Sequence, residues 1–199
     1  MGKTTLAVKL LSYKWIHEFN KVYIFCSTYA EDSTWSIFDE HVNSGKVEVF
    51  TEFKENQIRK LWNIAKKRHI ENKNYKTLFY FDDFGAVEGF KSNSDTGVLN
   101  ELSSRGNHSG ISLIYVVQKF TQTSVTVRLN TEAFVIFFTQ QKNELDHMYN
   151  EFGIGKRKEF EEMLQRSTAI PYSTFYVNRQ GPGAPDYYEN FKKIKINPK

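Results

Sequence analysis

Short, strongly apolar runs recur along the chain and alternate with longer segments of mixed character. The run Lys21–Cys26 is apolar at every position after its lysine, so both of its faces are expected to be buried, as in a parallel strand covered on both sides. Comparable runs predict strands at Lys46–Phe50, Thr77–Phe81, Ile111–Val117, Ala133–Phe138 and, as a late edge strand, Ser173–Val177.

The segment Lys54–Asn72 has the period of an amphipathic helix. Ile58, Leu61 and Ala65 recur at helical spacing, and most of the lysines and arginines fall on other faces. A basic face of this kind is either solvated or directed at DNA. Further helices are predicted at Thr4–Asn20, around Trp35–Val42, up to Ser104, at Asn143–Asn150 and at Lys156–Gln165.

The alternation of strands and helices predicts an α/β fold of three layers, in which helices cover both faces of a mostly parallel sheet. In such sheets, ligands bind at the carboxyl ends of the strands. We expect residues 1–180 to form one domain. The Gly- and Pro-rich segment Gly181–Pro185 should break regular structure, which leaves residues 181–199 as a basic, aromatic C-terminal tail.

Composition adds three limits to this picture. The 199 residues carry a net charge of +4, which is compatible with a polyanionic partner but does not require one. The single cysteine, Cys26, excludes an internal disulfide and is expected to be a small buried residue at a strand end. No apolar run is long enough to span a bilayer.

The first candidate for chemistry is Gly2-Lys3-Thr4-Thr5, which matches the second half of the phosphate-binding pattern G-x-x-x-x-G-K-[ST]. Gly2 would let the backbone approach a phosphate, Lys3 would reach the β- and γ-phosphates, and the Thr4 hydroxyl would bind Mg²⁺. The N-terminal amides of the following helix, beginning with Thr5, would face the anion. A match of four residues also occurs by chance, so it is weak by itself.

The second candidate is the pair Asp82-Asp83, which follows the apolar run Leu78–Phe81. This pattern is typical of a Walker B strand, in which Asp82 would hold Mg²⁺ and Asp83 would activate the attacking water. Two aspartates that close a strand in an ordinary turn would look the same.

The third candidate is Gln118, which follows the predicted strand Ile111–Val117 and would lie near the γ-phosphate. It would sense the phosphate or position water, although a glutamine that simply caps the strand is an equal alternative. Arg105 and Arg128 are candidates for an arginine that enters a neighbouring subunit's site and stabilises charge on the transferred phosphoryl group. A surface salt bridge is the ordinary alternative for each arginine.

Taken in order, the segments GKTT, FYFDDFG, SSRGNHSGISLIYVVQ, VRLN and AFVIFF resemble the genome-packaging ATPases of poxviruses and other large DNA viruses, virophages and polinton-like elements. These ATPases are relatives of the FtsK–HerA DNA translocases and have a RecA-like P-loop NTPase fold. The resemblance covers about residues 1–150. Its most specific part is RGNHSGIS, followed by the strand that ends at Gln118 and then by Arg128 and Asn130.

The resemblance implies hydrolysis of ATP with Mg²⁺, coupled to pumping of double-stranded DNA into a capsid by a ring of subunits. It implies capsid or portal-vertex proteins as partners, and the host cytoplasm, a viral factory or the virion vertex as the location. It gives Lys3 and Thr4 the Walker A role, Asp82 and Asp83 the Walker B role, and Gln118 the sensor role. Arg105 is the expected trans-acting arginine, and Arg128 is the alternate.

Two departures from the family pattern stand out. Many relatives have Asp-Glu where this chain has Asp82-Asp83, so the attacking water would have to lie closer to the shorter side chain. The first glycine of the phosphate loop and the strand before it are missing ahead of Gly2, which leads us to expect a truncated reading frame or a fragment. Neighbouring strands would then have unpaired backbone groups, unless they repack to close the gap.

Two other functions are compatible with the same motifs. One is a P-loop NTPase with another role, such as a helicase, a conjugation ATPase or a nucleotide kinase. The other is a catalytically inactive module that binds DNA or the capsid. Three basic segments are candidates for DNA or shell contact: the helix Lys54–Asn72, the cluster Lys156–Lys158 and the C-terminal tail.

Overall fold

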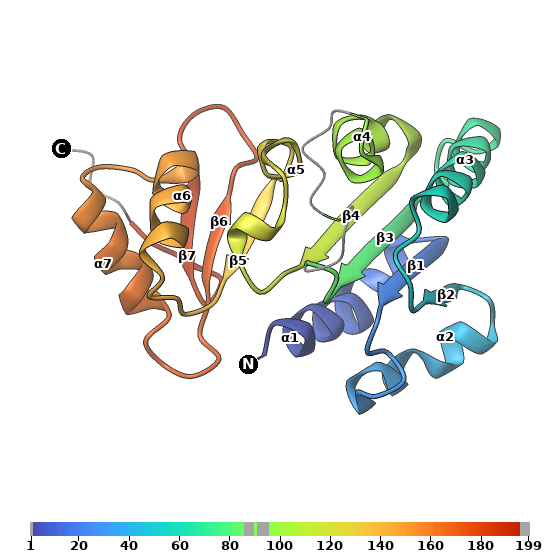
Figure 1. Ribbon diagram of the computed structural model, residues 1–199, viewed down its shortest axis with the longest axis horizontal. Coiled ribbons are helices and arrows are strands. Elements are labelled where there is room, and N and C mark those ends of the chain that lie inside the picture. Colours follow the sequence, from blue (N-terminus) through green and yellow to red (C-terminus); the bar gives the residue numbers. More distant parts are fainter. Residues whose placement is uncertain (1, 86–89, 91–95, 196–199) are drawn as a thin grey trace. The chain divides into compact units, whose positions relative to one another are not determined.

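A parallel sheet of four strands, in the order β2-β1-β3-β4, forms the centre of the first part of the molecule (Figure 1). The computed structural model describes residues 2–85, 90 and 96–195, and it divides into two compact units, Gly2–Arg128 and Leu129–Lys199. The strands of the first unit are β1 (Lys21–Cys26), β2 (Val47–Phe50), β3 (Thr77–Asp82) and β4 (Ile111–Val116). All four were predicted to within a residue or two.

Helices cover both faces of this sheet, as the predicted three layers require. On one face lie α3 (Glu55–Glu71) and α4 (Val98–Arg105) (Figure 1). They pack against aromatic side chains of β1 and β3. On the other face lie α1 (Lys3–Leu10), its continuation through Glu18, and the turn that carries Trp35, which leads into α2 (Asp39–Asn43). Alternate residues of β3 therefore contact different layers: Phe81 packs towards α3 and Tyr80 towards α1.

The second unit has its own antiparallel sheet, in the order β5-β6-β7-β8. Its strands are β5 (Ala133–Ile136), β6 (Phe175–Asn178), β7 (Asp186–Glu189) and β8 (Lys192–Lys193), and its helices are α6 (Lys142–Phe152) and α7 (Arg157–Ser167). Aromatic rings join the helices to the sheet: Phe152 of α6 meets Phe160 of α7, and Phe160 meets Phe175 of β6. The short helix α5 (Val125–Leu129) ends at the first residue of this unit.

Three expectations about this unit differ from the structure. The predicted strand Ala133–Phe138 does not extend the parallel sheet, and the predicted edge strand Ser173–Val177 is an inner strand that pairs with both β5 and β7. Residues 186–189 and 192–193 form β7 and β8, although the sequence suggested a tail there, and Tyr187 is buried in the core of the unit. Apolar runs predict that a strand is buried, but they do not identify its neighbours in the sheet.

The edge of β4 that faces away from β3 pairs with no strand among the described residues. This strand pairs in parallel with β3 over Ile111–Val116, and the same sheet continues through β1 to β2. Ser112 in β4 is exposed, and Leu113, Ile114 and Tyr115 are only half-buried. No strand of the described chain has therefore repacked against this edge.

Candidate active site

The carboxyl ends of three neighbouring parallel strands place the candidate residues at one edge of the sheet. Asp82, the last residue of β3, lies in register with Cys26 of β1 and Val116 of β4. Asp83 and Gln118 follow within two residues of these strand ends. Cys26 is buried at the end of β1, as expected, and burial raises the pKa of its thiol.

The Asp82 carboxylate is buried at this edge and accepts two side-chain hydrogen bonds. Its side chain bonds to the Thr4 hydroxyl, and the Tyr80 hydroxyl donates to Oδ2 over 3.3 Å. Burial raises the pKa of Asp82 to about 6, while the bonds from Thr4 and Tyr80 lower it and the nearby charge of Asp83 raises it further. A cation beside this buried carboxyl would stabilise its ionised form.

The candidate phosphate-binding residues form the start of α1, so the amides of the first helical turn are available to an anion. Gly2 immediately precedes the helix with a backbone φ of 112°, a conformation that residues other than glycine rarely adopt. Lys3 is the first helical residue, Thr4 reaches Asp82, and Thr5 is exposed. The structure thus brings the GKTT motif and the acidic strand end together across 78 positions of sequence.

Asp83 and Gln118 also meet. The Gln118 side-chain amide donates to Oδ1 of Asp83 over 3.2 Å, and both side chains are exposed. Asp83 has φ of 61°, an uncommon conformation for a residue with a side chain, and it turns this carboxylate away from the buried position of Asp82. Two carboxylates in sequence therefore have different environments, one buried and one in solvent.

The two candidate arginines have different environments. Arg105 ends α4 on the surface, six residues before β4 begins, and is therefore near the amino ends of the strands, whereas Asp82 lies at their carboxyl ends. Arg128 is only 5% exposed; its guanidinium donates to the Thr123 carbonyl over 2.5 Å and lies over the Phe120 ring. Arg105 is thus in solvent at the end of α4, whereas Arg128 is buried and held by the segment that follows β4.

Sequence reasoning missed two residues at this edge. Tyr80 could have been found, because it lies two positions before Asp82 on the same face of β3. Gln122 had no signal: its side chain contacts the loops that follow both β3 and β4, and only the folded chain brings these loops together.

The described residues contain no group of three or more His, Cys, Asp or Glu side chains that could hold a metal ion. Mg²⁺ does not require such a cage, since proteins commonly hold it with one or two carboxylates together with the phosphates of a nucleotide. The buried Asp82 carboxylate beside the Thr4 hydroxyl is an oxygen donor set that fits this ion.

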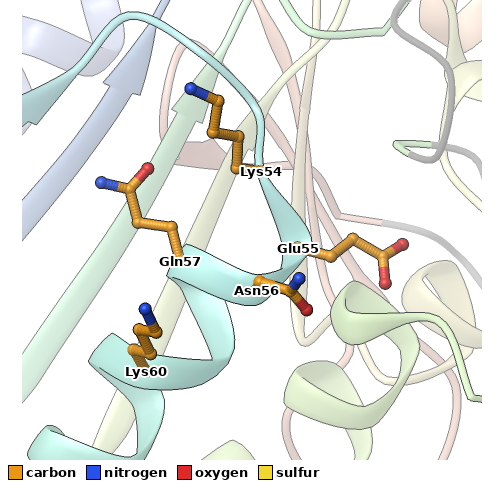
Figure 2. Close-up of a pocket in the computed structure, with 5 residues that line it drawn as sticks. All are labelled: Lys54, Glu55, Asn56, Gln57 and Lys60. Atoms are coloured by element: carbon orange, nitrogen blue, oxygen red, sulfur yellow. The ribbon is translucent and has the colours of Figure 1, made fainter.

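A shallow hollow lies at another place, around the first turn of α3 (Figure 2). Five polar residues line it: Lys54, Glu55, Asn56, Gln57 and Lys60. Lys54, Gln57 and Lys60 direct their nitrogens to one side of the helix, and Glu55 points away from them (Figure 2). The hollow contains no candidate catalytic residue.

The sequence of residues 1–171 matches the family described as poxvirus A32 protein. The chain belongs to this family. No curated protein matches the sequence of this A32-family chain. None of its helices, in the part of the chain that the structure describes, is long and apolar enough to cross a membrane.

Solved structures share the fold of this A32-family chain. The DNA-packaging ATPase B204 of Sulfolobus turreted icosahedral virus superposes with a TM-score of 0.66 and 18% identity, over 94% of this chain and 92% of that one. The genome-packaging NTPase B204 of Sulfolobus turreted icosahedral virus 2, in complex with ATP-gammaS, gives a TM-score of 0.63 and 18% identity over 97% and 92%. The complex of the latter protein with AMP gives 0.63 and 17% over 87% of each chain. At these identities, the likeness establishes the RecA-like fold that the sequence predicted.

Proposed function

We propose that this chain is the ATPase of a viral genome-packaging motor. Membership of the A32 family and the fold shared with B204 support this function. The observation that carries it is the contact between the Thr4 hydroxyl and the buried Asp82 carboxylate, beside the pair formed by Asp83 and Gln118. A helix N-terminus, a buried acid, an exposed acid and an amide at one sheet edge are the groups that hydrolysis of a nucleoside triphosphate needs.

Each residue has a distinct role in this proposal. The amides at the start of α1 and the Lys3 ammonium bind the phosphates, and Thr4 and Asp82 hold Mg²⁺. The ion, when bound, neutralises charge on the phosphate oxygens. Asp83 lies in solvent, where its carboxylate can accept a proton from water, and Gln118 orients the Asp83 carboxylate or the water itself.

We further propose that the motor is a ring of identical subunits that acts on double-stranded DNA at a capsid or portal vertex in the infected cell. Arg105 is then the arginine supplied to the neighbouring subunit, since it is exposed and far from the site of its own subunit. The burial of Arg128 favours Arg105 over this alternate.

The basic helix α3 is the segment we propose for contact with DNA. Several of its charges are already used: Arg59 pairs with Glu101, and Lys67 and Arg68 lie near Glu71. Lys60 and Lys66 are exposed and, among the described residues, have no carboxylate within 4.0 Å. The cluster at Lys156–Lys158 is a weaker candidate, because Arg157 pairs with Asp146 and Glu161.

Salt dependence tests this surface. Replacing Lys60 and Lys66 with alanine should weaken DNA binding for all sequences and reduce the slope of log K against log salt by up to about two. Replacing Lys9 and Lys14 is the matched control, because these exposed lysines lie on the opposite layer. Equal effects of the two double variants would remove α3 as the DNA contact.

ATP hydrolysis with and without linear double-stranded DNA tests the function itself. The chain should hydrolyse ATP, DNA should stimulate it, and Lys3→Ala should abolish the activity, whereas Lys9→Ala at the far end of the same helix should leave it unchanged. Full activity of Lys3→Ala would refute the assigned site. Binding of DNA without any hydrolysis or nucleotide binding would instead favour the inactive binding module.

A further inference from the structure

Gln122 holds the backbone that follows β4. It ends the 3₁₀ turn Phe120–Gln122, and its side chain folds back towards the strand. Oε1 accepts two hydrogen bonds, one from the backbone N–H of Gln118 over 2.8 Å and one from the backbone N–H of Lys119 over 2.9 Å. One side-chain oxygen thus fixes the two residues at the exit of the strand, where no helix or sheet does so.

The same side chain lies directly on the loop that follows β3. A Cβ added to Gly85 would be 2.6 Å from both Cδ and Oε1 of Gln122 and 2.9 Å from its Nε2. These distances are shorter than any ordinary contact, so a side chain at position 85 would force the end of the Gln122 side chain out of its place. Gly85 is not among the positive-φ residues, and the requirement therefore comes from the contact rather than from its backbone conformation.

Among the described residues, the two loops consequently meet at two points. Gln122 packs on Gly85, and the Gln118 side chain donates to Asp83. The Gln118 amide reaches Asp83 only while its own backbone stays in place, and Gln122 is the residue that holds that backbone. We propose that Gln122 is a positioning residue, which keeps Gln118 against Asp83 and couples the loops after β3 and β4. Its effect on ATP turnover rests on the proposed function; the coupling of the loops does not.

Amide hydrogen exchange tests the coupling without reference to activity. Gln122→Met keeps the length of the side chain but removes the acceptor, whereas Gln122→Glu keeps an acceptor oxygen. In Gln122→Met, the Gln118 and Lys119 amides should exchange about 5- to 10-fold faster, the change expected from the loss of about 1 kcal/mol of hydrogen bonding. Gln122→Glu should retain most of the protection. Unchanged exchange in Gln122→Met would overturn the proposal.

A pair of substitutions tests the contact with Gly85. Gly85→Ala should displace the Gln122 side chain and therefore expose the same two amides. In a Gln122→Ala background, Gly85→Ala should have little further effect, since the obstructing side chain is gone. Independent, additive effects of the two substitutions would show that the loops are not coupled through this contact.

Kinetics then separates positioning from a general loss of structure. Gln122→Met should lower kcat about 10- to 100-fold with little change in KM for ATP and a fall in Tm of no more than about 4 °C, because the water-orienting groups move while phosphate binding by α1 is untouched. Gln122→Glu should recover a large part of kcat. If Gln122→Met lost amide protection but the unmodified chain had no ATPase activity, the result would support the coupling of the loops and would count against the proposed function alone. Normal ATP turnover by Gln122→Met would overturn the positioning role.

Discussion

Replacing Asp82 with asparagine should stabilise the chain when no nucleotide or metal is bound. The carboxylate is only 4% exposed, and its partners are hydroxyls rather than a cation. Asparagine has nearly the same shape, still offers an oxygen to Thr4 and Tyr80, and carries no charge to desolvate. A site built to hold a cation is expected to be strained without one.

The magnitude follows from the pKa. Burial raises the pKa of Asp82 from 3.8 to about 6, which corresponds to about 3 kcal/mol of preference for the protonated form. Because the folded-state pKa lies above the unfolded-state value, ionisation of Asp82 destabilises the fold. The contribution of this residue to stability is most favourable below pH 3.8 and is lost as the pH rises through about 6. We therefore expect Asp82→Asn to raise the free energy of unfolding by about 2–3 kcal/mol at pH 8, a rise in Tm of about 4–10 °C.

Calorimetric unfolding of the chain in EDTA, at pH 8 and at pH 4, measures this difference. Asp83→Asn is the matched control: Asp83 is exposed, and asparagine tolerates its positive φ, so its unfolding free energy should change by less than about 0.5 kcal/mol. The gain in unfolding free energy from Asp82→Asn should shrink towards zero at pH 4. The same variant should have lost ATP hydrolysis. If Asp82→Asn were no more stable than Asp83→Asn at pH 8, the inference of a desolvated carboxylate would be refuted.

Three further substitutions have defined outcomes. Tyr80→Phe removes the hydroxyl that donates to the buried carboxylate and should lower kcat about 5-fold, the equivalent of one hydrogen bond of about 1 kcal/mol, while steady-state kinetics should show KM for ATP nearly unchanged. Arg105→Ala should reduce ATP hydrolysis about 1000-fold in the assembled ring, and mixing it with Lys3→Ala should restore part of the activity; a mixture as inactive as its parts would exclude an arginine supplied in trans. Tyr187→Phe loses a buried hydrogen bond to a backbone carbonyl of α6 and should lower the free energy of unfolding in denaturant by about 1–2 kcal/mol. The control Tyr188→Phe, on the other face of β7, should lower it by less than about 0.5 kcal/mol, and equal losses would contradict this interpretation.

Local pattern was sufficient for the elements that build the first unit. The predicted strand at Lys21–Cys26 and the predicted helix at Lys54–Asn72 agree with β1 and α3 to within a residue at each end. Continuous apolar runs also predicted burial on both faces, and every residue of β3 is buried. Periodicity is reliable here because each side chain's exposure depends on its position along its own element.

The pairing of strands in the second unit could not be obtained in this way. The run at Ala133–Ile136 has the composition of a parallel strand, yet it pairs antiparallel with β6, and β6 in turn with β7. The partner of β5 is set by contacts between residues about 40 positions apart, and an apolar run is compatible with either arrangement. The burial of Tyr187 in a segment that reads as a tail has the same cause.

For the site, the sequence by itself determined which residues stand at the ends of strands and at the start of a helix: Thr4, Asp82, Asp83 and Gln118. Parallel strands bring their carboxyl ends to one edge, so the order of these elements along the chain is enough to expect the four residues to meet. Tertiary structure alone decided that the Arg128 guanidinium is held inside the subunit while Arg105 remains on the surface. It also placed Gln122 on Gly85, because a contact between two loops depends on the path of each loop in space, and no periodicity along the chain records that path.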